Sequence, residues 1–365
     1  MSPSLCSLRY TALCYYTGVG GSGRRVGSAI GLVVLLGACG PGRVDAIDPG
    51  ASPRPAPVAT VPGVAAGDDR LVPLPDGPSA FSAIRALLLG AQTDIEVEMY
   101  EFQRADLKGL LLQAQQRQVT VTAIMDPSER QSQASWADLE AAGVRVLAFP
   151  IETRSIDHVK LLIVDRRIAI VGGINWGRHS ELNRDYDLLA EGPVAANLER
   201  IFDQDRTLAG DPVALPPAVP DALVRVVATR PGHDIRDAVL SAIAGARRTI
   251  DVEMYVLSDP LVLDELRQAA ARGLRVRVLL DPGQLQNLQS LATLQAASVQ
   301  ARLYHAPPGT KLHAKLGIFD QTLVVFGSCN WSRSGFTRNH ELDLVIQDAK
   351  LAAAFGARLD QDWAA

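Results

Sequence analysis

The chain has 365 residues, enough for one large or two ordinary domains with a buried core. Its hydrophobic content of 47% and charged content of 21% fit a globular protein over most of the length. The formal net charge of −4 argues against a long nucleic acid as the main partner, because such binders usually carry a broad basic face. Three of the four cysteines lie in the first forty residues, so no disulfide framework is expected in the globular part.

The first 39 residues predict a targeting segment. Two arginines precede the apolar run VGSAIGLVVLLGACG, which is too short to span a bilayer comfortably and has the charged, apolar and small-residue regions of a signal peptide. Its end, Leu36-Gly37-Ala38-Cys39, resembles the lipobox of bacterial lipoproteins, and the resemblance implies that Cys39 is lipidated. A simple signal peptide or an N-terminal membrane anchor is the alternative. We therefore expect export to a bacterial cell envelope, with the true start of translation further in than Met1.

Residues 40–69 are rich in proline, alanine and glycine without periodicity, which predicts a flexible tether. From residue 70 the chain divides into two copies. The segment GAQTDIEVEMY, residues 90–100, recurs as GARRTIDVEMY at an offset of 155 residues, and several later pairs keep that offset. An offset that stays constant over such a length indicates duplication. Because an offset of 155 residues far exceeds the period of a solenoid repeat, each copy should be a whole α/β unit. We predict domains at 70–215 and 216–365.

The predicted elements follow the same order in both copies. A helix opens at Pro78 or Ser79, and its counterpart begins near Asp234, because apolar residues recur there on one helical face. In the first copy a strand at 95–100, a helix at 105–117, the strand VTVTAIMD (119–126), a helix at 133–142 and a strand at 144–149 follow. In the second copy the same order runs through 250–255, 260–272, the strand LRVRVLLD (274–281), 285–297 and 299–304. The histidine strand, a second apolar strand, a polar loop, a last strand and a closing helix complete each copy. Strands rich in valine, isoleucine and leucine between helices predict two similar α/β domains, each with a sheet buried on both faces.

One residue pattern occurs once in each copy. The first copy reads His158-x-Lys160-x4-Asp165 and continues to Gly172, Gly173 and Asn175, and the second reads His313-x-Lys315-x4-Asp320 and continues to Gly327, Ser328 and Asn330. Residues two apart on a strand point the same way, so the imidazole and the ammonium share one face. The intervening Val159 and Ala314 are expected to face the core.

Two such copies facing each other place two histidines, two lysines and two asparagines around one point. Lysines and amides can neutralise the non-bridging oxygens of a phosphodiester as charge shifts in the transition state. One imidazole can attack phosphorus while the other protonates the leaving alcohol. The pattern therefore predicts a phosphodiester site shared by the two copies.

Both stretches resemble the HxKxxxxD signature of the phospholipase D superfamily, with its following G-[G/S]-x-N segment, and the resemblance covers nearly the whole chain from residue 70. It implies two α/β sandwich domains related by a pseudo-two-fold axis, a phosphohistidine intermediate and chemistry without metal or cofactor. In two-copy members the N-terminal histidine is commonly the nucleophile, so His158 is expected to attack and His313 to act as acid. An acidic residue in a downstream N-x-[E/D] segment often orients the histidine, which implies this role for Glu341 and Asp185, with Asp187 as a rival to Asp185.

Other candidates carry weaker signals. The loop residues His179, His340, Arg178, Arg333 and Arg338 are expected either to touch a head group or to be solvated, and the loop with His305 and Lys311 to line an entrance. Trp176 and Trp331 are expected in the core, and Cys329 as a small packed side chain. No Cys/His cluster has the spacing of metal ligands.

Three functions stay open. A phospholipid hydrolase or phosphatidyltransferase, similar to the cardiolipin synthases, fits the tether, the acidic balance and the closing segments DYDLLAEGPVAANLERIFDQD and DAKLAAAFGARLDQDW. A nuclease fits GSCNWSRSGFTRNHE, which resembles the small endonucleases of the superfamily. A non-enzymatic envelope-binding protein would not need both motifs intact. The first is preferred, with a phospholipid at a membrane surface as substrate and a monomer as the catalytic unit, because one chain carries both copies.

Overall fold

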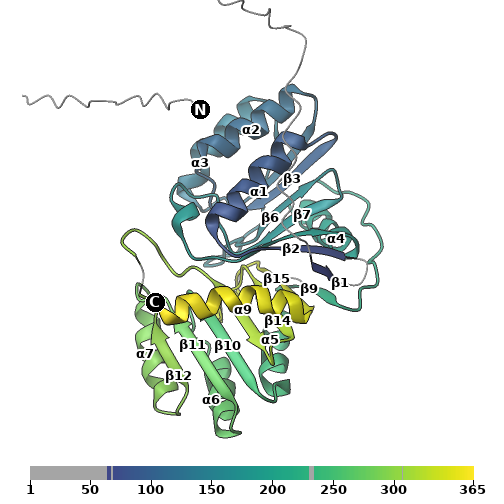
Figure 1. Cartoon of the computed structure of the whole chain (residues 1–365). Coiled ribbons are helices and arrows are strands. Elements are labelled where there is room, and N and C mark those ends of the chain that lie inside the picture. The colour runs from purple at the N-terminus through teal and green to yellow at the C-terminus, as the bar shows by residue number, and fades with distance from the viewer. Residues whose placement is uncertain (1–63, 67–68, 230–233, 306) are drawn as a thin grey trace, which may run out of the picture. The chain divides into compact units, whose positions relative to one another are not determined.

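The computed structural model describes residues 64–66, 69–229, 234–305 and 307–365 (Figure 1). The predicted signal peptide and Cys39 lie outside the described residues. The predicted tether also lies outside them, except at its end, where Val64–Ala66 and Asp69 already belong to a sheet. The tether prediction is corrected there, because these residues pair with each other as an antiparallel edge.

Two mixed sheets carry the fold, and apart from β1 they have the same strand order. The first sheet runs β1-β2-β8-β7-β6-β3-β4-β5 and the second β9-β15-β14-β13-β10-β11-β12. The strands of the first are β1 (Val64–Ala66), β2 (Asp69–Leu74), β3 (Asp94–Met99), β4 (Thr120–Met125), β5 (Arg145–Ala148), β6 (Lys160–Val164), β7 (Ile168–Gly172) and β8 (Asp187–Glu191). The strands of the second are β9 (Val224–Ala228), β10 (Thr249–Met254), β11 (Arg275–Leu280), β12 (Gln300–Leu303), β13 (Lys315–Phe319), β14 (Leu323–Gly327) and β15 (Leu342–Gln347).

Helices cover both faces of each sheet, as the continuous apolar strands require. The first half contains α1 (Gly77–Gly90), α2 (Ala105–Gln116), η1 (Arg130–Ser132), α3 (Gln133–Ala141), η2 (Ser180–Leu182) and α4 (Pro193–Leu208). The second contains α5 (Asp234–Gly245), α6 (Pro260–Ala271), α7 (Leu285–Gln295), α8 (Arg333–Thr337) and α9 (Ala349–Ala364). The predicted boundary between the domains at residue 215 falls in the segment that links α4 to β9.

Among the residues that the structure describes, three hydrophobic clusters form the core. One lies between the first sheet and α1, α2 and α3, and a second lies between the other sheet and α5, α6 and α7. The third joins the two halves, because α4, α9 and the facing sides of both sheets contribute to it. Val159 and Ala314 belong to this third cluster and are fully buried, as the strand alternation predicted. The halves are therefore packed against each other through a shared core.

Local signals explain most boundaries. Asp76 caps α1 by accepting a hydrogen bond from the backbone of Ser79, so the helix begins two residues before the predicted Ser79 start. The strands β2 and β9 were not predicted, because their pairing with β8 and β15 depends on residues far away in the sequence. No helix in the described part of the chain has both the length and the apolar character needed to cross a membrane.

Candidate active site

The two histidines stand on extended segments just before β6 and β13. The His158 amide donates to the carbonyl of His340 at 2.8 Å, and the His313 amide donates to the carbonyl of Arg184 at 2.7 Å. Each histidine segment thus pairs with the N-x-acid segment of the other half, as the isolated bridges Asp157↔His340 and Arg184↔Leu312 also show. The predicted strand position of the histidines is corrected slightly, because β6 and β13 begin at the lysines.

This exchange of segments also exchanges the carboxylates. Nδ1 of His158 lies 2.8 Å from Oε2 of Glu341, and Nδ1 of His313 lies 2.6 Å from Oδ2 of Asp185. Each imidazole is therefore held by an acid of the opposite half, which leaves its Nε2 for other partners. The rival Asp187 instead accepts from the backbone of Ile174 at 3.4 Å. The sequence could not show that the partners cross between the halves.

The surroundings of the two carboxylates differ. Glu341 accepts hydrogen bonds from Oγ of Ser328 at 2.6 Å and from Nδ2 of Asn339 at 3.0 Å. At the position equivalent to Ser328 stands Gly173, where any side chain would collide with Oδ1 of Asp185. The shorter aspartate therefore needs the glycine, and the longer glutamate is fixed by the serine.

Both lysines are almost fully buried beside the histidines. Nζ of Lys160 donates to the carbonyl of His158, and Nζ of Lys315 donates to the carbonyl of His313 and lies 3.2 Å from its Nε2. Burial lowers the pKa of Lys160 to about 7 and also lowers the pKa of Lys315. Burial and the nearby Lys315 lower the pKa of His313 to about 3, and burial with the two lysines lowers the pKa of His158 well below its usual value. Both imidazoles are thus neutral at pH 7 in the protein alone.

The two motif asparagines are not equivalent. Asn175 lines the same cleft as both histidines, and its buried Oδ1 has no hydrogen-bond partner within the described ranges. Oδ1 of Asn330 accepts from the backbone amide of Val256 at 3.2 Å. Asn175 therefore has an amide available for a ligand, whereas Asn330 is partly committed to the protein.

The motif aspartates are not brought together with the histidines. Asp165 follows the far end of β6 and accepts from the amides of Gln92 and Thr93 at 2.9 and 2.8 Å. Asp320 follows β13 and accepts from the amides of Arg247 and Arg248 at 2.9 and 2.7 Å. The prediction that groups them with the catalytic side chains is corrected, because four residues of strand separate each aspartate from its lysine and the oxygens of each aspartate accept hydrogen bonds from backbone amides.

The catalytic candidates open into one cleft of about 770 Å³. Both His158 and His313 line it, together with polar residues of both halves, among them Glu101, Glu129, Asn183, Arg178, His179 and Lys311. Arg178, His179 and Lys311 were predicted to lie near a ligand or an entrance, and the structure places all three in the lining of this cleft. His340 does not line the cleft, and at 1% exposure it is neither a solvated loop residue nor a head-group contact.

Two tyrosines of the site were not predicted from the sequence. Tyr100 and Tyr255 end the repeated segment [E/D]-V-E-M-Y and pack against His158 and His313, with ring centroids 5.1 and 4.6 Å apart. Nζ of Lys160 and Lys315 also lies over these rings. Their place in a repeated sequence next to a buried strand was the available signal. Trp176, Trp331 and Cys329 are buried in the core, as predicted.

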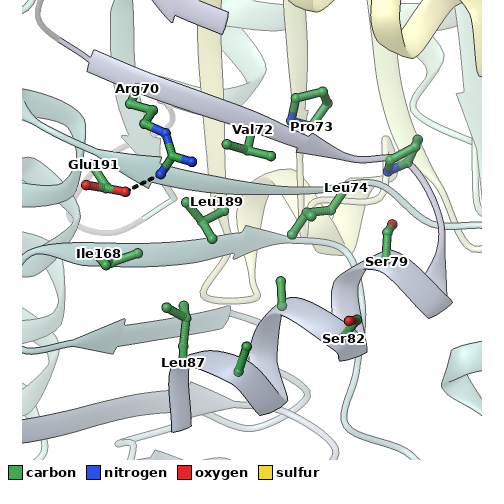
Figure 2. A pocket seen from close by; sticks show the side chains of 13 residues that line it. Arg70, Val72, Pro73, Leu74, Ser79, Ser82, Leu87, Ile168, Leu189 and Glu191 are labelled. Atoms are coloured by element: carbon green, nitrogen blue, oxygen red, sulfur yellow. Dashed lines mark hydrogen bonds and ion pairs between the residues drawn. The ribbon is translucent and has the colours of Figure 1, made fainter. Parts of the chain in front are cut away.

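A second hollow of about 460 Å³ lies between α1 and the edge of the first sheet (Figure 2). Its walls are mostly apolar, with Val72, Leu74 and Leu189 from the strands and Leu87 from α1, and the ion pair of Arg70 with Glu191 lies at one end. It contains none of the residues that the sequence analysis assigned to the chemistry. The cleft with the histidines is therefore the candidate active site.

Two α/β halves of equal strand order, with both motif histidines lining one cleft, define a two-copy phospholipase D-like enzyme. The chain belongs to the family described as "Cardiolipin synthase, PLD-like domain", which matches residues 84–206 and 239–363. The resemblance stated from the two motifs is thereby confirmed.

Similar proteins agree with this assignment. Cardiolipin synthase A from Pseudomonas putida (strain GB-1) is 28% identical over 322 residues, which cover 79% of this chain and 67% of that protein. Cardiolipin synthase A from Pseudomonas fluorescens (strain SBW25) is 27% identical over 323 residues, which cover 79% of this chain and 67% of that protein. The matched region spans about two thirds of these relatives.

Solved structures support the fold alone. Phosphatidylserine synthase from Haemophilus influenzae Rd KW20 has a TM-score of 0.66 at 13% identity, over 83% of this chain and 86% of that one. Polyphosphate kinase from Porphyromonas gingivalis has a TM-score of 0.59 at 18% identity, over 80% of this chain and 46% of that one. Both are similar to this chain in their arrangement of helices and strands.

Proposed function

We propose that the chain is a phosphatidyltransferase or phosphodiesterase of phospholipase D type that acts on phospholipids through a phosphohistidine intermediate, with no metal taking part in the reaction. One observation carries the proposal: two histidines line one cleft, and a carboxylate of the opposite half holds Nδ1 of each. This arrangement leaves both Nε2 atoms to share the work of nucleophile and acid.

In the first step, Nε2 of one histidine attacks phosphorus and the bond from phosphorus to the leaving alcohol breaks. The other histidine gives its proton to the oxygen of that alcohol. In the second step, water or another alcohol attacks the phosphohistidine and passes its proton to the second histidine. The P–N bond breaks, both imidazoles return to their starting forms, and the product is a phosphatidic acid or a new phosphodiester.

The buried lysines supply the positive charge that this exchange needs. Lys160 and Lys315 stand beside the two imidazoles, and charge–charge interactions are strong where water is excluded. A phosphodiester anion offsets the lysine charges that lower the pKa of His313. Substrate binding is therefore expected to raise that pKa and to let the His313–Asp185 pair carry the proton.

We assign His158 as the nucleophile and His313 as the acid. The charge of Glu341 is shared with the donors Ser328 and Asn339, whereas Gly173 offers no side-chain donor to Asp185. A carboxylate with fewer other donors stabilises an imidazolium better. The Asp185 side of the site is therefore suited to the histidine that carries a proton.

A phospholipid is favoured over a nucleic acid as substrate. The cleft combines the basic residues Arg178 and Lys311 with the acidic residues Glu101 and Glu129, which suits a single phosphodiester better than a polyanion. Leu182 lines the cleft and is 57% exposed, so an apolar side chain is available at the substrate. The curated relatives are named cardiolipin synthases, in agreement with a lipid substrate.

The purified full-length chain can be offered vesicles with fluorescent phosphatidylglycerol or phosphatidylcholine, and separately labelled single-stranded DNA. We expect turnover of lipid that is lost in both His158→Ala and His313→Ala. The acceptor is identified by adding glycerol and measuring the ratio of phosphatidylglycerol to phosphatidic acid formed from phosphatidylcholine. DNA cleavage that is lost in both variants, without any lipid turnover, would contradict the lipid assignment and favour a nuclease.

We also propose that the chain is an envelope lipoprotein attached through Cys39. The support is the sequence of the leader and the lipid substrate inferred above, since a tether would hold the enzyme near its bilayer. In a bacterial host fed labelled palmitate, the mature chain should carry label and Cys39→Ala should not. Label in neither chain, with a mature N-terminus other than residue 39, would indicate a simple signal peptide.

A further inference from the structure

Behind the catalytic centre lies a group of buried ionisable side chains that the proposed reaction does not use. Glu98 of β3, Asp157, Asp205 of α4 and His340 are each at most 1% exposed, and together we call them the buried acidic cluster. Three come from the first half, and His340 reaches in from the second. His340 and Glu341 are neighbours, so their side chains point to opposite sides: one into this cluster and one toward His158.

The contacts within the cluster leave most of its oxygens unsatisfied. Nε2 of His340 lies 2.9 Å from Oδ2 of Asp205 and 3.7 Å from Oε1 of Glu98. Both carboxylate oxygens of Glu98, Oδ1 of Asp205 and Oδ2 of Asp157 have no hydrogen-bond partner in the part of the chain that the structure describes. Buried carboxylates without partners are costly, so carboxylates packed against one another need a cation or protons between them.

The second half contains the duplicate of this cluster, and there the charges are balanced by the protein. Glu253 corresponds to Glu98, Asp362 to Asp205 and Arg184 to His340, while Leu312 takes the place of Asp157. Nε of Arg184 lies 3.3 Å from Asp362, which is also paired with Arg358, and the hydroxyl of Tyr186 donates to Glu253 at 2.7 Å.

The two halves differ in the balance of buried charge at this position. Two carboxylates face two guanidinium groups in the second half, whereas three carboxylates face one imidazole in the first. The ring of Phe149 stacks on the imidazole of His340, with ring centroids 4.6 Å apart. Tyr304 is the counterpart of Phe149 in the second half, and its hydroxyl accepts a hydrogen bond from Nε of Arg184 at 3.1 Å. The first half therefore has a histidine where the second has an arginine, and an aspartate where the second has a leucine.

We infer that the buried acidic cluster binds one divalent transition-metal ion through Glu98, Asp205 and His340. One ligand atom from each of these residues lies within 4.8 Å of the others, which is the spacing of donors around a single ion. Imidazole with carboxylates suits Zn²⁺ or Mn²⁺. Asp157, whose free oxygen lies in the same cluster, is the available fourth carboxylate.

The ion has a structural role and stays outside the reaction. It fixes His340, whose carbonyl accepts from the His158 amide and whose neighbour Glu341 holds the His158 ring. Arg184 does the same for His313 in the other half without a metal. The ion is therefore a positioning element of the His158 side alone, and this inference does not depend on which phosphodiester is the substrate.

The test uses the full-length chain, expressed in medium with added Zn²⁺ and Mn²⁺ and purified without chelator. Metal content is measured by mass spectrometry, and the melting temperature is measured before and after dialysis against EDTA. We expect close to one equivalent of metal in the wild type, a lower melting temperature after EDTA and recovery on adding Zn²⁺ or Mn²⁺.

Two variants and one control test whether the metal is bound by the buried acidic cluster. Glu98→Gln should lose the metal, and His340→Arg should lose it while keeping the fold, because the arginine copies the second half. Glu253→Gln, the duplicate position, should retain the full equivalent. Less than 0.1 equivalent in the wild type, with a melting temperature that neither EDTA nor added metal changes, would overturn the inference and indicate that protons neutralise the cluster. Metal retained in both Glu98→Gln and His340→Arg would also overturn it.

Discussion

Glu341 and Asp185 differ by one methylene, and the residue opposite each has changed to match. Ser328 donates to the longer side chain, and Gly173 makes room for the shorter one. Both carboxylates hold Nδ1 of a histidine from the other half. The two ends of the site are thus built from the same parts but are not interchangeable.

Removing either carboxylate charge should slow the reaction strongly. In Glu341→Gln and Asp185→Asn the amide can rotate to keep a hydrogen bond but no longer stabilises an imidazolium, so we expect kcat to fall on the order of 100-fold or more with a much smaller change in KM. Asp187→Asn is the control, because Asp187 contacts backbone rather than a histidine. Steady-state kinetics on vesicles would measure this, and equal losses in all three variants would contradict the pairing.

The pH dependence of kcat/KM should reflect the titration of the buried Lys160. Burial lowers the pKa of Lys160 to about 7, and the ammonium is charged below that pH and neutral above it. We therefore expect kcat/KM, which reports the free enzyme, to fall as the pH rises through about 7. In Lys160→Arg the guanidinium stays charged, so the alkaline fall should move to higher pH even though overall activity drops. An unchanged alkaline limb in that variant would assign the fall to another group.

At the scale of elements, the motif aspartates define the turns that end β6 and β13. Asp165 and Asp320 have φ of 53° and 51°, and their side chains bind the backbone that leads into β3 and β10. Aspartate and asparagine tolerate this left-handed backbone better than alanine does. The aspartate of the pattern is thus part of the fold, at the opposite end of the strand from the lysine.

Replacing Asp165 should therefore reduce stability rather than chemistry. Asp165→Ala leaves the amides of Gln92 and Thr93 without their acceptor, and we expect the free energy of unfolding to fall by about 1–3 kcal/mol. Asp165→Asn should lose less, since it keeps an acceptor and the backbone preference. Urea unfolding gives the stability, and kcat per folded molecule should remain within about twofold of wild type by this argument. A large loss of kcat in stably folded Asp165→Asn would restore a catalytic role.

Some of the elements could be predicted from the sequence and others could not. The fixed offset between the copies predicted the two α/β domains, because a pattern that recurs at a constant spacing marks the same element in each copy. It also led us to expect each lysine beside its histidine and Asn175 in the same cleft as both histidines, which is where the structure places them. The sequence did not predict the strands β2 and β9, the pairing of Glu341 and Asp185 with histidines of the other half, or the burial of His340. These features depend on contacts between distant parts of the chain, which no local periodicity records.

For the whole molecule, the duplication makes one complete site from one chain. The halves share a hydrophobic core, and each contributes a histidine and the acid that holds the other's histidine. Neither half has a full set of catalytic groups. We therefore propose that a single chain needs no second copy to act.

Mixing two inactive variants tests this directly. Because His158 and His313 serve the same cleft in one chain, equal amounts of His158→Ala and His313→Ala should remain inactive after mixing and after co-expression. Co-expressed tagged and untagged chains, purified by the tag, show whether mixed assemblies formed at all. Recovery of about a quarter or more of wild-type activity would mean that sites are completed between chains.

The central claim is tested by trapping the phosphoenzyme. A phosphatidyl ester of p-nitrophenol, labelled in its phosphate, has a leaving group that needs no proton, so His313→Ala should still be phosphorylated but cannot activate water in the second step. After rapid quenching in alkaline detergent, which preserves phosphohistidine, we predict stoichiometric label on the peptide that contains His158 and none in His158→Ala. Label on the His313 peptide of the wild type and of His158→Ala would reverse the two roles, and turnover without any labelled histidine would contradict the shared two-histidine mechanism.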